Sequence, residues 1–138
     1  MTIQQHEIVL QTHGRGAQDI TAMINQVLLN GKVRIGLCHL FVKHTSASLM
    51  ICENYDEQVR IDLEHFLSQL IPDGDPLFLH TIEGKDDMPA HIRTILTQSD
   101  LQLPIQQGKL ALGTWQGIFL YEHRYEAHER HIIMTVIG

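Results

Sequence analysis

The stretch Val33-Arg-Ile-Gly-Leu-Cys-His-Leu-Phe-Val42 is apolar at both odd and even positions. Because side chains alternate between the two faces of a strand, apolar residues on both parities predict a strand that is covered on both faces. Such a strand belongs in the middle of a sheet. Residues 33–42 are therefore expected to form a central strand.

The segments on either side of this stretch predict six more strands and three helices. Apolar alternation or apolar runs predict strands over residues 3–12, 49–52, 101–105, 110–112, 118–124 and 130–137. Helical spacing and capping residues predict helices over residues 17–30, where Asn30-Gly31 offers a left-handed stop, over 56–70 and over about 89–97. About seven strands and three helices predict an α+β domain, either a β-sandwich or a partly closed barrel, that spans residues 1–138.

The composition narrows the classes of function. Hydrophobic residues make up 43% of the 138 residues, which suits one globular core, and the formal charge is -6 with scattered basic residues, which argues against a nucleic-acid partner. No signal-peptide pattern and no apolar run of about 18 residues is present, so we expect a cytoplasmic protein with no membrane partner. Cys38 and Cys52 lie in apolar runs, which indicates buried thiols rather than a disulfide framework.

The stretch His80-Thr-Ile-Glu-Gly-Lys-Asp-Asp-Met-Pro-Ala-His91 holds two histidines and three acidic residues. If an aspartate caps a helix with Pro89 in its first turn, His91 projects from that turn while His80 approaches from the preceding extended segment. Imidazole suits a transition metal and carboxylate suits magnesium, so the stretch could support metal-assisted chemistry. The alternative is a polar loop that only caps a helix, because the spacing matches no strict zinc motif.

A second polar motif, His44-Thr-Ser-Ala-Ser48, interrupts two apolar segments. Such corners are common sites of function, although the hydroxyl groups could merely satisfy their own backbone at a turn. His44 is the residue of interest here. Glu53 and Asn54 end the following strand and could face a site, whereas Asp62 lies beside the apolar stripe of the next helix, where simple solvent exposure is the alternative.

A third motif, Gly113-Thr114-Trp115-Gln116-Gly117, places two glycines around polar and aromatic residues. This arrangement suggests a backbone held close either to a neighbouring strand or to a ligand. In the strand that follows, Glu122 and Arg124 are expected to share one face, and His123 takes the other. The chain contains no P-loop, no G-x-G-x-x-G, no G-x-S-x-G and no C-x-x-C.

These motifs, taken together and in chain order, resemble the YjbQ family across nearly the whole chain. The resemblance implies a trimeric α+β sandwich with sites near subunit contacts, and a low, secondary thiamine-phosphate synthase activity. It does not imply the (β/α)₈ barrel of ordinary thiamine-phosphate synthases, for which this chain is too short. The positions that match the family are His44, Glu53, Asn54, Asp62, His80, Glu83, Asp86, Asp87, His91, Thr114, Trp115, Gln116, Glu122 and Arg124.

The reaction implied by the resemblance joins a pyrimidine methyl diphosphate to a thiazole phosphate and releases diphosphate. A divalent metal, zinc or magnesium, together with His44 and Arg124 could neutralise the leaving group, while Trp115 stacks on a ring and Glu122 acts as a general base. The expected catalytic residues are Glu122, Asp62 and His44; the expected substrate-binding residues are Thr114, Trp115, Gln116, Arg124, Glu53 and Asn54; and the expected metal ligands are His44, His80 and His91.

Two functions follow as hypotheses. The first is an enzyme that acts on a phosphorylated small molecule, with thiamine-phosphate formation as a secondary activity. The second is a non-catalytic homotrimer that binds a metal or a phosphorylated ligand. A pure interaction module fits poorly with so many polar motifs.

Overall fold

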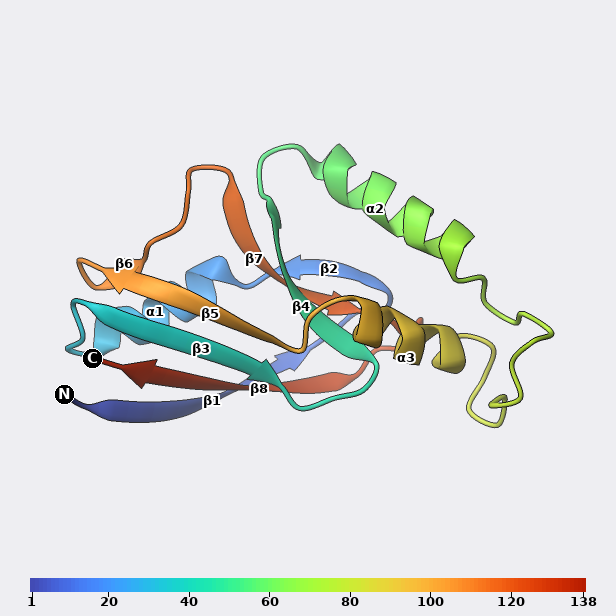
Figure 1. Ribbon diagram of the computed structural model, residues 1–138, viewed down its shortest axis with the longest axis horizontal. Helices are drawn as coiled ribbons and strands as arrows, with labels where there is room; N and C mark the ends of the chain where they lie inside the picture. Colours follow the sequence, from blue (N-terminus) through green and yellow to red (C-terminus); the bar gives the residue numbers. More distant parts are fainter.

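The computed structural model describes residues 1–138, which form two antiparallel sheets and three helices (Figure 1). The five-stranded sheet has the order β1 (Ile3–Gln11), β8 (Glu129–Ile137), β3 (Gly36–Val42), β5 (Asp100–Gln106) and β6 (Lys109–Leu110). The three-stranded sheet has the order β2 (Gly16–Asp19), β7 (Gln116–Glu122) and β4 (Ala47–Glu53). The helices are α1 (Thr21–Asn30), α2 (Glu57–Leu70) and α3 (Asp87–Leu96). The α+β expectation is confirmed, with eight strands rather than seven.

Both sheets and α1 contribute to one core of 20 buried apolar residues. Leu40 of β3, Leu120 of β7 and Ile24 of α1 are fully buried members of it. An isolated bridge between Leu49 and Gln98 joins the edge of the small sheet to the segment just before β5. The two sheets therefore curl around a shared core.

The strand β3 lies in the middle of its sheet, hydrogen-bonded to β8 on one side and β5 on the other, as predicted. Its inner face is buried and includes Cys38, whose thiol pKa burial raises to about 12. On the outer face, however, Leu37 is 49% and Phe41 is 44% exposed. The expectation that this strand is covered on both faces is thus wrong within one chain, because periodicity reports apolar character and not what covers it.

The first helix differs from its prediction at both ends. It begins at Thr21 rather than Ala17, because Gly16–Asp19 pairs with β7 as the additional strand β2. At the other end Gly31 has φ −94° and ψ −179°, an extended conformation rather than the expected left-handed stop. Its N–H still donates to the Leu28 carbonyl, at 3.1 Å.

The helix α2 begins as predicted, because the Asp56 side chain accepts a hydrogen bond from the Gln58 N–H at 2.9 Å. None of its residues is buried, so its apolar stripe does not reach the core. Instead the Glu64 carboxylate anchors it, accepting from Arg93 of α3 at 2.7 and 3.0 Å and from the Tyr121 hydroxyl at 2.8 Å. Burial alone would raise the pKa of Glu64, but these donors lower it to about 2.

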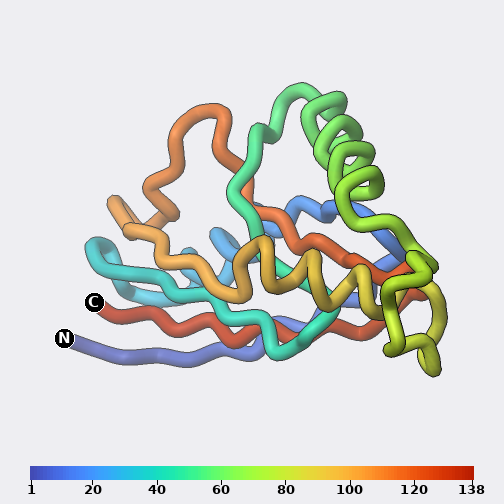
Figure 2. Tube along the Cα trace, turned by 45° about the vertical axis from the view of Figure 1, so that its right-hand side comes forward, coloured from blue at the N-terminus to red at the C-terminus, as the bar shows by residue number.

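The long loop between α2 and α3 projects at one end of the molecule, where it returns beside the start of α3 (Figure 2). The termini meet at the opposite end, where the Thr2 N–H donates to the Gly138 carbonyl at 2.6 Å. None of the three helices has both the length and the apolar character needed to cross a membrane.

Candidate metal centre

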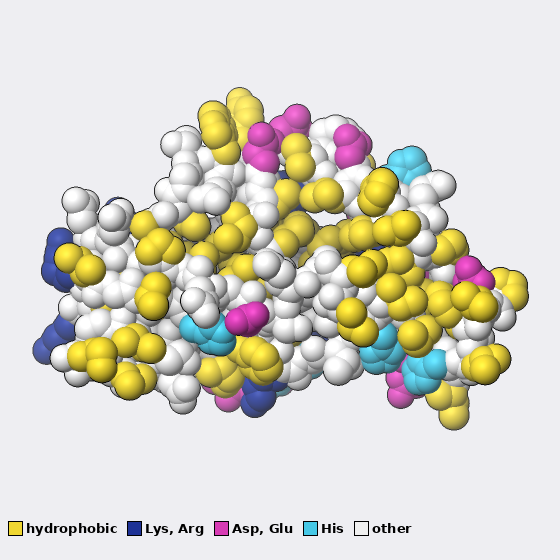
Figure 3. All heavy atoms as spheres, in the orientation of Figure 1, with side chains coloured by type: hydrophobic (Ala, Val, Ile, Leu, Met, Phe, Trp, Pro, Cys, Tyr) yellow, Lys and Arg dark blue, Asp and Glu magenta, His cyan; other side chains and the backbone are white.

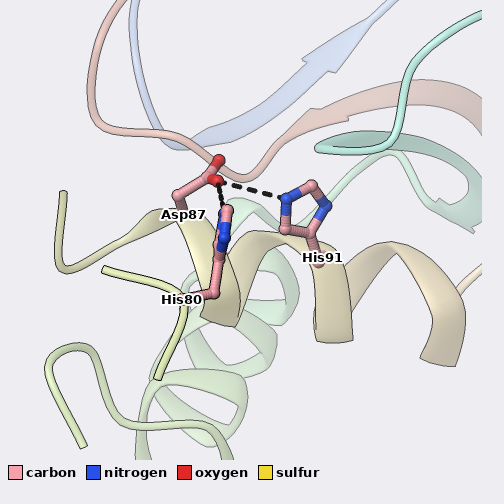
Figure 4. A group of neighbouring side chains, drawn as sticks. All are labelled: His80, Asp87 and His91. Carbon is pink, nitrogen blue, oxygen red and sulfur yellow. Dashed lines mark hydrogen bonds and ion pairs between the residues drawn. The ribbon is translucent and has the colours of Figure 1, made fainter. Parts of the chain in front are cut away.

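The start of α3 and the loop before it bring His80, Asp87 and His91 together (Figure 4). Asp87 and His91 stand four residues apart, on one face of the helix, and His80 approaches from the loop. Asp87 Oδ2 lies 2.7 Å from His80 Nε2 and 3.1 Å from His91 Nε2. One ligand atom from each residue thus falls within 4.8 Å of the others.

A hydrogen bond to the Thr45 carbonyl fixes the orientation of the His91 ring. His91 Nδ1 lies 3.1 Å from the Thr45 carbonyl oxygen, which can only accept, so this ring nitrogen carries the proton and donates it. In the neutral ring Nε2 then presents a lone pair toward Asp87 Oδ2, and two acceptors face each other unless a cation or a proton lies between them. A ligating histidine that donates its other N–H to a backbone carbonyl is a frequent arrangement at metal sites.

The Arg124 guanidinium holds the carboxylate side of the site. Its Nη1 donates to Asp87 Oδ1 at 2.8 Å, its Nε donates to Asp86 Oδ2 at 3.0 Å, and its Nη2 donates to the Glu83 carbonyl at 2.8 Å. Burial would raise the pKa of Asp87, but the hydrogen bond from His80 and the nearby charge of Arg124 hold it below its ordinary value. Asp87 is therefore a carboxylate with Oδ1 occupied and Oδ2 turned toward the imidazoles.

Asp86 occupies the N-cap position of α3 but makes no side-chain cap bond. Its Oδ2 instead accepts from Arg124 and from the Tyr125 N–H, at 2.9 Å. The prediction that an aspartate begins this helix, with Pro89 in the first turn, is confirmed. The capping hydrogen bond is replaced by contacts that tie the loop to the end of β7.

His44 lies outside the group of three. Its Nε2 accepts a hydrogen bond from the His131 N–H at 2.8 Å, and the two rings are 5.9 Å apart. Burial and the charge of Arg130 lower its pKa. Within one chain the structure groups Asp87, rather than His44, with His80 and His91 as side chains that could hold a metal ion. The Asp-x-x-x-His spacing was the signal that could have indicated Asp87.

Glu122 is buried and its carboxylate is fully engaged. It accepts from the Thr12 hydroxyl at 2.7 Å, from Arg130 Nε at 2.9 Å and Nη2, and from the Arg124 N–H at 3.2 Å. Burial would raise its pKa, but Arg130 and Thr12 lower it below the ordinary value. Glu122 and Arg124 were expected to share one strand face, but β7 ends at Glu122 and Arg124 lies beyond it. The two side chains form separate ion pairs, Glu122 with Arg130 and Arg124 with the two aspartates of α3.

The remaining predicted residues gather at the other end of β4 and β7. The Asn54 N–H donates to the Trp115 carbonyl at 3.0 Å, and Gln116 Oε1 accepts from the Gly113 N–H at 2.8 Å. A Cβ on Gly117 would lie 3.0 Å from Asn54 Cβ, so this glycine allows two strands to approach closely. Glu53 is the last residue of β4, and Thr114 lies in the loop before β7.

Six residue steps along β7 separate Gln116 from Glu122, which at about 3.4 Å a step is about 20 Å. Within one chain, the group around Trp115 and the group around His80 are therefore distinct. Asp62 lies in neither; it is exposed on α2, where it accepts from the Gln58 side chain at 2.8 Å.

Comparisons with known proteins agree on one group of relatives. A family model described as "UPF0047 protein YjbQ-like" matches residues 6–138. UPF0047 protein sll1880 of Synechocystis sp. is 46% identical to this chain over 139 residues, which cover 99% of this chain and 95% of the relative. UPF0047 protein YjbQ of Escherichia coli O157:H7 is 42% identical over 135 residues, which cover 97% of each protein. A solved Clostridium acetobutylicum structure described as an uncharacterized conserved protein of the yjbq/upf0047 family superposes with a TM-score of 0.87 at 32% identity, covering 96% of this chain and 99% of that one. The conserved hypothetical protein TT1486 of Thermus thermophilus gives a TM-score of 0.86 at 31% identity, with the same coverage.

Proposed function

The chain belongs to the YjbQ-like UPF0047 family, and on this premise we propose that it is a metal-dependent enzyme that acts on phosphorylated small molecules. The proposal rests on the convergence of His80 Nε2, His91 Nε2 and Asp87 Oδ2. His91 is oriented by the Thr45 carbonyl and Asp87 by Arg124, while His80 contacts Asp87 itself. Two imidazoles and one carboxylate make three protein ligands and leave further positions for water or substrate.

The donor set favours zinc over magnesium. Magnesium binds hard oxygen ligands and keeps several waters, whereas two imidazole nitrogens suit a transition metal. Two histidines with one acidic residue form a frequent ligand set of catalytic zinc. When bound, the metal would supply Lewis acidity toward a phosphate oxygen.

A cavity of about 360 Å³ adjoins His80 and supports a phosphorylated ligand. Its lining includes Thr81, Gly84 and Lys85. No carboxylate lies within 4.0 Å of the Lys85 ammonium, so this charge is available to an anion. Lys85 would hold the phosphate of a ligand whose other end reaches the metal ligands.

Thiamine-phosphate synthesis is the specific reaction that we propose to test first. Its support is the resemblance of the motifs to the YjbQ family, and it requires charge neutralisation on a departing diphosphate, a task suited to Lys85 beside the proposed zinc ligands. Glu122 is a weaker candidate for the general base, because its lowered pKa and four donors oppose proton transfer. Its catalytic role remains a prediction, as do those of Asp62 and His44.

A non-catalytic binding protein is the second candidate, and one observation favours it. Two charged residues at the end of β7 are both engaged: Glu122, predicted for catalysis, by Arg130 and Thr12, and Arg124, predicted for substrate binding, by Asp86, Asp87 and the Glu83 carbonyl. A protein with these groups committed to structure could hold a metal and a phosphorylated ligand without turnover.

We also propose that the chain assembles as a homotrimer. The resemblance supports this assembly, and so does an apolar surface over α3 and the facing side of α2, visible as a concentration of hydrophobic side chains in Figure 3. Leu79 is 95% and Ile82 is 90% exposed on either side of His80. Exposed apolar residues on these elements include Leu63, Phe66 and Leu70 of α2, Leu77 of the loop that follows it, and Ile95 and Leu96 of α3. A second copy would cover them and enclose the region of the metal ligands.

The test is a synthase assay with pyrimidine diphosphate and thiazole phosphate, run with added zinc on the parent protein and on two variants. His91→Ala should lower the rate by about 10²-fold or more, the lower end for a group that acts in the reaction. The matched control is His39→Ala, which breaks a similar 2.8 Å histidine–aspartate pair, with Asp100, on the five-stranded sheet. Turnover that persists within a few-fold in His91→Ala would favour the binding protein.

A further inference from the structure

The loops at the Trp115 end of β4 and β7 form an open cavity of about 750 Å³. It is lined by Glu53, Tyr55, Asp56, Val59 and Trp115. The ring centroids of Tyr55 and Trp115 are 5.4 Å apart in an edge-to-face arrangement. Tyr55 is nevertheless 79% exposed and Trp115 57% exposed, so the pair leaves aromatic surface open to a ligand.

The loops that carry these rings are joined firmly to each other. Asn54 donates from its backbone to the Trp115 carbonyl and from its side chain to the Gln116 carbonyl, at 3.0 and 3.4 Å. The Gln116 side chain closes the turn on Gly113, and Gly117 packs against Asn54. Trp115 is thus presented on a constrained turn, which limits the conformational entropy that a bound ligand would have to remove.

The charge that lines this cavity is of one sign. Glu53 and Asp56 contribute carboxylates, and no basic residue belongs to the lining. Arg60, the basic residue on the first turns of α2, donates to the backbone carbonyl of Glu53 and lies over the Phe119 ring at 4.7 Å, and it pairs with neither carboxylate of the lining. The N-terminus of α2 would by itself favour an anion, but Asp56 caps it and Glu57 lies in its first turn.

We infer that this cavity binds an organic cation, an alkylammonium or guanidinium group seated against the Trp115 and Tyr55 rings and paired with the Glu53 and Asp56 carboxylates. The negative face of an aromatic ring attracts a cation, tryptophan most strongly, and weakly hydrated organic cations lose little on entering such a site. The site lies at the Gln116 end of β7, about 20 Å along the strand from Glu122 at its other end. It goes beyond the proposed function and does not depend on it.

Trp115 is the one tryptophan of the chain, so its fluorescence reports on this cavity alone. The probes are choline and 3,3-dimethylbutan-1-ol, which has the same shape with a neutral carbon in place of the ammonium nitrogen. Choline should change the emission in a saturable way and shift the indole N–H resonance in NMR spectra. The neutral alcohol should bind at least about tenfold more weakly, because it lacks the cation–π and ion-pair attraction.

The carboxylates are tested by the double variant Glu53→Gln with Asp56→Asn, in which asparagine still caps α2. It should weaken choline about tenfold and leave the neutral alcohol unchanged. The control is Glu57→Gln, which removes one carboxylate from the residue after Asp56 without touching the cavity lining. That control should bind choline like the parent, within about twofold.

The cation could be a free small molecule or a basic side chain of another copy of the chain, and the same titration separates the two sources. If a second copy supplies it, Trp115 emission and the apparent choline affinity will change on dilution together with the molecular mass. If the ligand is free, both will be independent of protein concentration. Equal binding of choline and the neutral alcohol, no response to choline at any dilution, or parent-like choline binding by the carboxylate double variant would each overturn the inference.

Discussion

Acidification should destabilise the protein through His123, which is fully buried between Ser48 and the ring of Tyr121. Burial, together with the charges of Arg93 and Arg15, lowers the pKa of this imidazole from 6.5 to about 3. The folded protein therefore keeps the ring neutral where the unfolded chain protonates it. The contribution of His123 to the free energy of unfolding is fully present above pH 6.5, the pKa of histidine in the unfolded chain. It is lost as the pH falls from 6.5 toward 3.

The size of the effect follows from the shift. A shift of about 3.5 units at ~1.36 kcal/mol per unit gives a loss of about 5 kcal/mol when the full range is crossed. Between pH 6.5 and 4.5, protonation of His123 should lower the free energy of unfolding by about 2–3 kcal/mol. Glu64, with its pKa lowered from 4.5 to about 2, loses its contribution only at still lower pH, so this upper window isolates the histidines.

The assay is urea unfolding at fixed protein concentration, at several pH values from 7 to 4.5, for the parent and for His123→Gln. Glutamine can keep the hydrogen bond to Ser48, but it does not titrate. Because His44 is present in both proteins, the difference between the two pH profiles belongs to His123. We expect the parent to lose about 2–3 kcal/mol more than the variant. Parallel profiles would refute the reasoning, since they would mean that the folded protein admits the charged imidazole.

Three further perturbations test the structure elsewhere. Glu64→Gln should lower the free energy of unfolding, measured by urea unfolding, by about 3 kcal/mol, because it leaves the buried Arg93 guanidinium without its charge partner. The control Glu57→Gln on the same helix should change this free energy by less than about 0.5 kcal/mol. Gly117→Ala should cost about 1–3 kcal/mol by the same measurement, because the new methyl group would lie 3.0 Å from Asn54 Cβ and from the buried Phe119 ring; a variant as stable as the parent would mean that the ring yields freely. Phe66→Glu should reduce the mass in light scattering from about three times 15.8 kDa to that of one chain, and a parent protein that is already monomeric at micromolar concentration would remove the trimer proposal.

The parts of the fold that the sequence predicts are those in which local pattern and tertiary burial agree. Leu101, Leu103 and Ile105 alternate in the sequence and are all buried in β5. The strand β2 escaped prediction because Gly-Ala-Gln-Asp has no apolar alternation, and its pairing with β7 alone defines it. The extent of the apolar face on β3 was readable from the sequence, but its exposure at Phe41 was not.

For the candidate site, too, local features could be predicted from the sequence, whereas contacts between distant elements could not. The start of α3 could be predicted from its aspartates and Pro89, and with it the approach of His80 to His91. The partners of the charged residues could not, because they depend on distances between elements that the sequence separates. Arg124 pairs with Asp87 across 37 positions of the chain, and no periodicity carries that information.

The most direct test of the proposed metal centre is a measurement of zinc content by mass spectrometry. The protein is purified without a histidine tag and dialysed against a trace of zinc. The parent and the His39→Ala control should each hold about one zinc per chain. His91→Ala and Asp87→Asn should hold little, since each removes one of three converging ligand atoms. Equal zinc in the parent and in His91→Ala, or none in either, would contradict the assignment of His80, Asp87 and His91 as a metal centre.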